Sequence, residues 1–397
     1  MLTISNITSS LSAQKYYSSG DYYVSNNKTE EQLKNKGEQN NELFYNSNSD
    51  NKESISHDKE FNNQNSNNSL NNNLSLNYQE SLNSHNNNIP LNQWYGKGAK
   101  ELNLTEKEFD PKNFKDLLEG KIITNINGKY QEIQLGKKNK DGTLDHACGI
   151  DATFAPPKSV SILAEIGGDK DIVKAHDEAV NKTLDLIERE LSATRVKTNN
   201  QIDIEKTDNL IIAKFLHNTN RELDPHIHTH CTIMNIVKKD NGDYRSAYLK
   251  EIFNNKMNLG AIYRMELAHN LKQLGYQIDH KDKDAIFEIK GVSDEMIKAF
   301  SNRRQQIEEK LKELEKNDIH HENNSNANSN TKNISAKSKQ LANFLTRNKK
   351  IDIANKDLQE FWHDSIKEKD LSLESLQKVI SERKELNQNH QNKNNQT

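Results

Sequence analysis

The sequence predicts a mixed α/β protein of the α+β type, because strand-like and helix-like segments follow one another along its middle part. Two apolar stretches, "NLIIAKFLHN" and "HIHTHCTIMNIV", have the length and residue types of neighbouring β-strands joined by a polar turn. After Gly167 and Gly168, apolar residues recur three, four or seven positions apart, which is typical of an amphipathic helix. Only 32% of the 397 residues are hydrophobic, so we expect part of the chain to lie outside any core.

The other elements follow in order. "MLTISNI" alternates like a short strand, and "SSLSAQKYYSSGDYYV" predicts a helix interrupted at Gly20. "CGIDATF" predicts a strand, which the two prolines of "APPK" end before a helix begins. We expect helices over 257–274, closed by Gly275, and over about 294–314, with the strand "AIFEI" between them.

Composition divides the chain into six segments. Residues 1–24 form an N-terminal strand and helix, and residues 25–91 form an insertion rich in Asn and Ser. Residues 92–316 form the core, 317–337 an Asn-rich linker, 338–385 a helical segment and 386–397 a tail. The insertion and the tail are predicted to be disordered, because so little apolar surface does not offset the conformational entropy lost on ordering.

Net charge, cysteine content and the absence of long apolar runs indicate which partners and which cellular compartment to expect. The chain has 55 basic and 58 acidic residues, a balance that disfavours general coating of nucleic acid but permits a local basic cleft. The two cysteines, Cys148 and Cys231, define no disulfide framework, and Cys231 is expected to be buried on the strand face opposite the histidines. The sequence contains neither a secretory signal nor a membrane-spanning apolar run, so we predict a cytoplasmic protein without membrane insertion.

The segment "HIHTHC" places His226, His228 and His230 at every second position of a predicted strand, so their side chains share one face. Neighbours in this row lie about 6.6 Å apart and can share one ion, whereas the outer two, about 13 Å apart, hardly can. His217 ends the preceding strand, and antiparallel pairing would bring it close as a further ligand. The spacing leaves open whether His226 and His228 or His228 and His230 are used, and a solvated histidine face is the alternative.

Two tyrosine pairs, Tyr16–Tyr17 and Tyr22–Tyr23, lie near the N-terminus. A tyrosine hydroxyl becomes a nucleophile beside a base or a metal, although aromatic packing of a short helix is the simpler explanation of this stretch alone. Asp151 lies within an apolar strand, where it could accept a tyrosine proton, orient a metal-binding histidine, or face solvent. A tyrosine, a carboxylate and a histidine-bound divalent ion together suit phosphoryl transfer.

Taken together, these motifs resemble the TrwC/TraI-like (MobF-class) conjugative relaxases, which are HUH-type single-strand DNA endonucleases. The segments that carry the resemblance are, in order, "YYSSGDYY", "WYGKGAKELNL", "GIDATFAPPKSVS", "FLHNTNRELDPHIHTH", "YRMELAHNLKQLGY" and "FEIKGVSDEMIKAFSNRR". The resemblance covers about residues 1–24 and 92–315, and is weaker through about 385. It implies a palm-like fold in which helices pack on a central antiparallel sheet that carries a three-histidine metal site.

The resemblance also selects among the histidines. It implies that His217, His228 and His230 bind a divalent ion, with His226 left as a supporting or substitute residue. Mg²⁺ or Mn²⁺ suits phosphate chemistry best, and imidazole ligands would also accept Zn²⁺ or Ni²⁺.

For the remaining candidates the resemblance implies roles in DNA cleavage. Tyr16, or its neighbour Tyr17, would attack a phosphodiester at an origin of transfer and form a 5′-phosphotyrosine. Tyr22 or Tyr23 would act in a second strand transfer. Asp151 would assist deprotonation of the tyrosine or orient a ligand histidine.

Single-stranded DNA at an origin of transfer is the implied partner, together with accessory relaxosome and type IV secretion proteins, and a monomer is expected. Lys158 and Arg221 are the basic residues expected near the DNA, although each also fits a solvated charge.

Two features depart from the family pattern. The insertion separates the tyrosine pairs from Trp94, and no GxxxxGK[ST] phosphate loop is present, so no helicase domain is expected in this chain. The alternatives are a degenerate homologue that binds single-stranded DNA without cutting it, and an unrelated histidine-metal hydrolase.

Overall fold

The computed structural model describes residues 1–17, 89–126, 128–140, 142, 144–199, 201–281, 285–322, 336–348 and 355–394. Tyr22, Tyr23 and residues 25–88 of the predicted insertion lie outside the described residues, as do residues 323–335 of the predicted linker. In the described part of the chain, no helix is both long and apolar enough to span a membrane.

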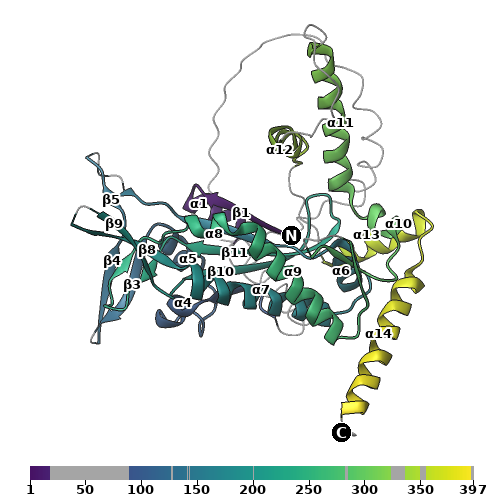
Figure 1. The fold of residues 1–397 in the computed structure, drawn as a ribbon, viewed down its shortest axis with the longest axis horizontal. Coiled ribbons are helices and arrows are strands. Elements are labelled where there is room, and N and C mark those ends of the chain that lie inside the picture. The colour runs from purple at the N-terminus through teal and green to yellow at the C-terminus, as the bar shows by residue number, and fades with distance from the viewer. Residues whose placement is uncertain are drawn as a thin grey trace, which may run out of the picture.

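The centre of the molecule is a five-stranded sheet in the order β1-β7-β11-β10-β2 (Figure 1). Every neighbouring pair in it is antiparallel. The predicted fold class, with its central antiparallel sheet, is therefore confirmed. The strands are β1 (Leu2–Ile7), β2 (Asn92–Tyr95), β7 (Gly149–Phe154), β10 (Ile212–Thr219) and β11 (Pro225–Met234).

One face of this sheet packs against α6 (Lys158–Glu165), α7 (Asp171–Leu191) and α9 (Lys256–Gln273). Alternate strand residues point to these helices, as the two-residue period of a strand requires. The helices and strands share one buried apolar core, which includes Ile150, Phe154, Ile227, Cys231, Val180, Leu184 and Leu267. Cys231 is fully buried on this face, as predicted.

The opposite face carries a second apolar core and leaves space for polar side chains. It is formed with α1 (Ser10–Tyr17), α4 (Lys97–Glu101) and α5 (Pro111–Leu118). Pro111 begins α5, and the Asp110 carboxylate caps it by accepting a hydrogen bond of 2.8 Å from the Lys112 amide. The core on this face includes Ala13, Trp94, Phe114, Leu117, Ala213 and Phe215.

Short hairpins extend from this framework, and those formed by β3, β4, β5, β8 and β9 lie toward one end of the molecule (Figure 1). The paired strands are β3 (Lys121–Ile126) with β4 (Lys129–Gln134), β5 (Lys137–Lys138) with β6 (Leu144–Asp145), β8 (Ala193–Thr198) with β9 (Gln201–Lys206), β12 (Val237–Lys238) with β13 (Tyr244–Arg245), and β14 (Ile278–His280) with β15 (Phe287–Ile289).

The C-terminal third is more helical than the sequence predicts. The helix expected over about 294–314 is divided into α10 (Asp294–Ala299) and α11 (Asn302–Glu322), and α11 continues into the predicted linker. The tail predicted to be disordered from residue 386 belongs instead to α14 (Leu373–Asn394) as far as Asn394. Once apolar residues nucleate a helix by packing, extending it through a polar segment costs little. The other helices are α8 (Lys250–Asn254), α12 (Ala336–Leu345) and α13 (Asn355–Glu368).

A buried ion pair fastens α14 to the core. The Arg383 guanidinium donates to both carboxylate oxygens of Asp169 at 2.8 and 2.6 Å, and to Asp171 at 2.8 Å. The Tyr276 hydroxyl donates to the same Asp169 carboxylate at 2.6 Å. A planar guanidinium that binds a carboxylate through two hydrogen bonds fixes orientation as well as distance, so α14 docks in one position.

His176 on α7 is fully buried behind β11. Its Nδ1 lies 2.7 Å from the Tyr263 hydroxyl, and its Nε2 lies 2.9 Å from the Thr229 hydroxyl. Burial, assisted by nearby positive charge from Lys214, lowers the pKa of this imidazole to about 3. The ring is therefore neutral in the folded protein at neutral pH.

This buried histidine is expected to make the fold sensitive to acid. Its pKa in the folded state lies below the ordinary 6.5, so between 6.5 and about 3 the unfolded chain binds the proton more readily. The contribution of neutral His176 to the free energy of unfolding is fully present above pH 6.5, and it decreases as the pH falls from 6.5 to about 3. We expect His176→Gln to flatten the pH dependence of the melting temperature there, measured by circular dichroism. An unaltered slope in the variant would contradict this assignment.

Candidate active site and metal centre

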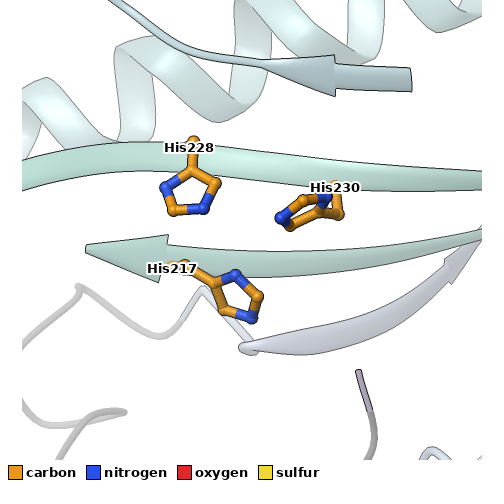
Figure 2. A group of neighbouring side chains, drawn as sticks. All are labelled: His217, His228 and His230. Carbon is orange, nitrogen blue, oxygen red and sulfur yellow. The ribbon is translucent and has the colours of Figure 1, made fainter. Parts of the chain in front are cut away.

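The paired strands β10 and β11 bring three histidines together on one sheet face. His217 lies directly opposite His228 in the register, and His230 follows two positions later on the same face. The three side chains come from these two strands and gather on one side of them (Figure 2), with ring centroids 5.1 Å apart in each pair. One nitrogen from each ring lies within 4.8 Å of the others. The structure thus groups His228 and His230, rather than His226 and His228, with His217.

Hydrogen bonds orient two of these rings. Nδ1 of His228 lies 2.8 Å from the His226 carbonyl oxygen, and Nδ1 of His230 lies 2.8 Å from Oδ2 of Asp151. Both partners are acceptors, so each Nδ1 donates and each Nε2 keeps its lone pair. His226 lies beside His228, with ring centroids 4.9 Å apart, but is not part of the trio.

The donor set fits a divalent metal ion. Nε2 of His230 is buried and lacks a hydrogen-bond partner among the described residues, which is costly for a polar atom unless a ligand satisfies it. Metal–imidazole bonds are about 2.0–2.1 Å long, so small side-chain movements would bring nitrogens already within 4.8 Å of one another onto a single ion.

Asp151 links the histidines to the tyrosines. It is 6% exposed, and its Oδ2 accepts hydrogen bonds from His230 at 2.8 Å, Tyr17 at 2.8 Å and Thr153 at 3.2 Å. Burial raises the pKa of this carboxyl, but the interactions with His230, Tyr17 and Thr153 outweigh burial and hold the pKa below its usual value. Asp151 is therefore an ionised carboxylate that is hydrogen-bonded to His230, one of the three grouped histidines.

Thr153 is a site residue that the sequence reasoning missed. Its hydroxyl lies 3.0 Å from Nδ1 of His230 in addition to its bond with Asp151. Because Thr153 follows Asp151 by two positions on β7, it projects from the same face of the strand. That spacing is the signal that would have identified it.

The first tyrosine pair occupies the end of α1, beside the histidines. The Tyr17 ring stacks on Phe215 with centroids 4.9 Å apart, and its hydroxyl donates to Asp151. The Tyr16 ring makes edge contacts with His230 and His217, at centroid distances of 5.7 and 6.5 Å. Tyr17 is therefore held on the carboxylate side of His230, whereas Tyr16 contacts two of the three grouped rings.

The two basic candidates contact backbone carbonyls. The Lys158 ammonium donates to the Pro225 carbonyl at 2.9 Å, and burial lowers the pKa of this side chain against the opposing influence of Asp224 and Glu288. Arg221 donates to the Asn348 carbonyl at 2.9 Å near the surface. Lys158 thus supports the start of β11, and DNA contact by either residue stays a prediction.

Comparison with known proteins agrees with this architecture. The multifunctional conjugation protein TraI of Escherichia coli is 29% identical over 303 residues, which are 74% of this chain but only 15% of TraI. Solved structures of the conjugative relaxase TrwC with oriT DNA are also similar. The metal-free form shares 36% identity with a TM-score of 0.59 over 71% of this chain and 92% of that one. The metal-bound form shares 36% identity with a TM-score of 0.60, over 71% and 90% of the two chains.

A family model described as TrwC relaxase matches residues 59–369, which is most of the chain. That match includes the aspartate and all three grouped histidines. The chain belongs to the TrwC relaxase family.

Proposed function

We propose that this protein nicks and rejoins one DNA strand at an origin of transfer by tyrosine transesterification, as a step of conjugative DNA transfer. One observation carries the proposal: the Tyr16–Tyr17 pair lies against the His217, His228 and His230 cluster, and Asp151 joins the two groups. Support also comes from the TrwC structures, whose descriptions name complexes with oriT DNA in metal-free, metal-bound and copper-bound forms.

In the proposed reaction, a tyrosine phenolate oxygen forms a bond to the scissile phosphorus while the bond to the 3′ oxygen breaks. The products are a 5′-phosphotyrosine and a free 3′ hydroxyl, and attack by that hydroxyl reverses the step. One phosphodiester replaces another, so the reaction conserves bond energy for rejoining. The ionised Asp151 carboxylate accepts a hydrogen bond from Tyr17 and would accept the phenol proton or orient the groups that do.

The histidine cluster would hold a divalent ion that offsets negative charge on the non-bridging phosphate oxygens. Mg²⁺ or Mn²⁺ matches an oxygen-rich phosphate, and three imidazoles also suit Zn²⁺ or Ni²⁺. The hydrogen bonds that Nδ1 of His228 and Nδ1 of His230 donate orient both rings for this task.

We also infer a role for the second tyrosine pair, and the location, oligomeric state and partners of the protein. We assign Tyr22 or Tyr23 to a second strand transfer. We infer a cytoplasmic, monomeric protein that acts on single-stranded DNA with accessory relaxosome and type IV secretion proteins. The chain spans about 15% of the length of TraI, and the proposal is limited to the nicking reaction.

The proposal is tested by covalent capture of DNA. The purified protein is mixed with single-stranded oligonucleotides that cover candidate transfer origins, in Mn²⁺ or in EDTA, and denaturing gels are read for a protein–DNA adduct. We expect an adduct in Mn²⁺ that EDTA and His228→Ala reduce to background. His269→Ala is the matched control, because His269 is an exposed histidine on α9, outside the cluster.

Two other outcomes would contradict the proposal. Retained binding of single-stranded DNA with no adduct on any origin would indicate a degenerate relaxase that no longer cuts. Cleavage without an adduct would indicate a histidine-metal hydrolase that uses water as its nucleophile.

A further inference from the structure

The turn between β10 and β11 sets the register of the histidine strand. Asn220 and Asp224 close it, because the Asn220 amide donates to the Asp224 carbonyl at 3.2 Å and the Asn220 side chain accepts from the Asp224 amide at 3.0 Å. Leu223 has a φ of 60° within this turn, a left-handed conformation that branched side chains rarely adopt. The β10–β11 register also shifts between His217 and Thr219. A slip of one residue here would turn His228 and His230 to the other sheet face.

A tryptophan from the C-terminal helices holds this turn. Nε1 of Trp362 on α13 donates a hydrogen bond of 2.7 Å to the carbonyl oxygen of Leu223, and both residues are buried. Trp362 is the largest fully buried side chain among the described residues, and it belongs to the same apolar core as Leu223. The bond therefore fixes the carbonyl of the one residue in the turn whose backbone conformation is unfavourable.

Contacts on either side keep α13 and the turn together. Gln359 on α13 donates to the Glu165 carbonyl at the end of α6 at 3.0 Å. Asn302 at the start of α11 donates to the Asp224 carboxylate at 2.8 Å. Lys158 on α6 donates to Pro225, the first residue of β11. The Trp362 bond spans 139 positions of the chain, and the Gln359 bond spans 194.

We propose that Trp362 is a positioning residue for the metal centre, holding the Leu223 turn so that β11 presents His228 and His230 to one ion together with His217. Metal–nitrogen bonds tolerate only small displacements, so a strand that starts in a variable position binds an ion less tightly. Loss of groups that orient metal ligands commonly weakens metal binding by about 10- to 100-fold. This inference rests on the proposed metal-dependent function of the cluster.

The test measures Mn²⁺ affinity of the full chain, by the electron paramagnetic resonance signal of the free ion. We expect Trp362→Phe, which keeps an aromatic ring but removes the N–H, to weaken Mn²⁺ binding about 10-fold. Ile366→Val is the matched control, because Ile366 is 3% exposed in the same core and on the same helix, and the substitution removes a methyl group but no hydrogen-bond donor. It should bind Mn²⁺ like the wild type.

Melting curves confirm that each variant is folded at the temperature of the titration. If Trp362→Phe is not folded, benzothienylalanine at position 362 replaces it, since that residue exchanges only the N–H for sulfur. Wild-type Mn²⁺ affinity in the folded variant would overturn the proposal, and so would equal weakening in Ile366→Val. Because the readout needs no DNA, a failure here leaves nicking intact, and a failure to nick leaves the affinity difference measurable.

Discussion

Tyr16→Phe is expected to abolish the covalent protein–DNA adduct, whereas Tyr17→Phe is expected to slow its formation about 10- to 100-fold. The two residues are adjacent and both lie beside the His230 ring, but their other contacts differ. Tyr16 meets the rings of His217 and His230, two of the three histidines that would hold the ion. Tyr17 is stacked on Phe215 and donates its hydroxyl proton to Asp151, so it acts as an orienting group.

The two variants serve as each other's control, because each removes one phenol oxygen from the same helix end. The measurement is the rate of adduct formation with a single-stranded origin oligonucleotide, followed by peptide mapping of the attached tyrosine. An adduct that persists in Tyr16→Phe and disappears in Tyr17→Phe would reverse the assignment. In that case the pair formed by Tyr17 and Asp151 would be nucleophile and base.

Asp151→Asn is expected to reduce the rate of nicking by about 10²- to 10⁴-fold. The amide cannot accept a proton. Its NH₂ group would also confront Nδ1 of His230, which now donates to the carboxylate, and would favour the wrong ring tautomer for binding a metal. Asp203→Asn, on the exposed strand β9, removes the same charge away from the site and should leave the rate unchanged.

Mn²⁺ affinity separates the two functions of Asp151. If the carboxylate mainly orients His230, the affinity and the rate fall together in Asp151→Asn. If it mainly accepts the proton, the rate falls while the affinity is retained. An Asp151→Asn protein that nicks at the wild-type rate would contradict both roles.

The centre of the site was predictable because it depends on local periodicity. Alternation along one strand placed His228 and His230 on a common face, and the end of the preceding strand suggested His217. The same alternation correctly buried Cys231. Spacing alone left the choice between His226 and His230 open. The family resemblance selected His230, and the register agrees, because it places His217 opposite His228 and leaves His226 outside the trio.

Contacts between distant parts of the chain were not predictable in the same way. The bond from Tyr17 to Asp151 spans 134 positions, and no local pattern in either segment specifies it. Lys158 was expected near DNA or as a solvated charge, and no local pattern specified its bond to the Pro225 carbonyl, 67 positions away. The polar end of α14 looked disordered by composition. It is helical because it continues a helix whose upstream apolar residues, such as Leu376 and Ile380, are buried.

The sheet order places the metal-binding histidines and the tyrosines on segments that differ in their resistance to local unfolding. The histidines belong to strands with neighbours on both sides, whereas β1, which leads into the tyrosine helix, lies at the edge and pairs with β7 alone among the described residues. Interior strands commonly open only when the whole domain unfolds, whereas peripheral segments open at a fraction of that free energy. A DNA end attached to Tyr16 would therefore be carried by a peripheral segment of the sheet. The ion-binding strands would stay closed while the attached end is moved and later returned for rejoining.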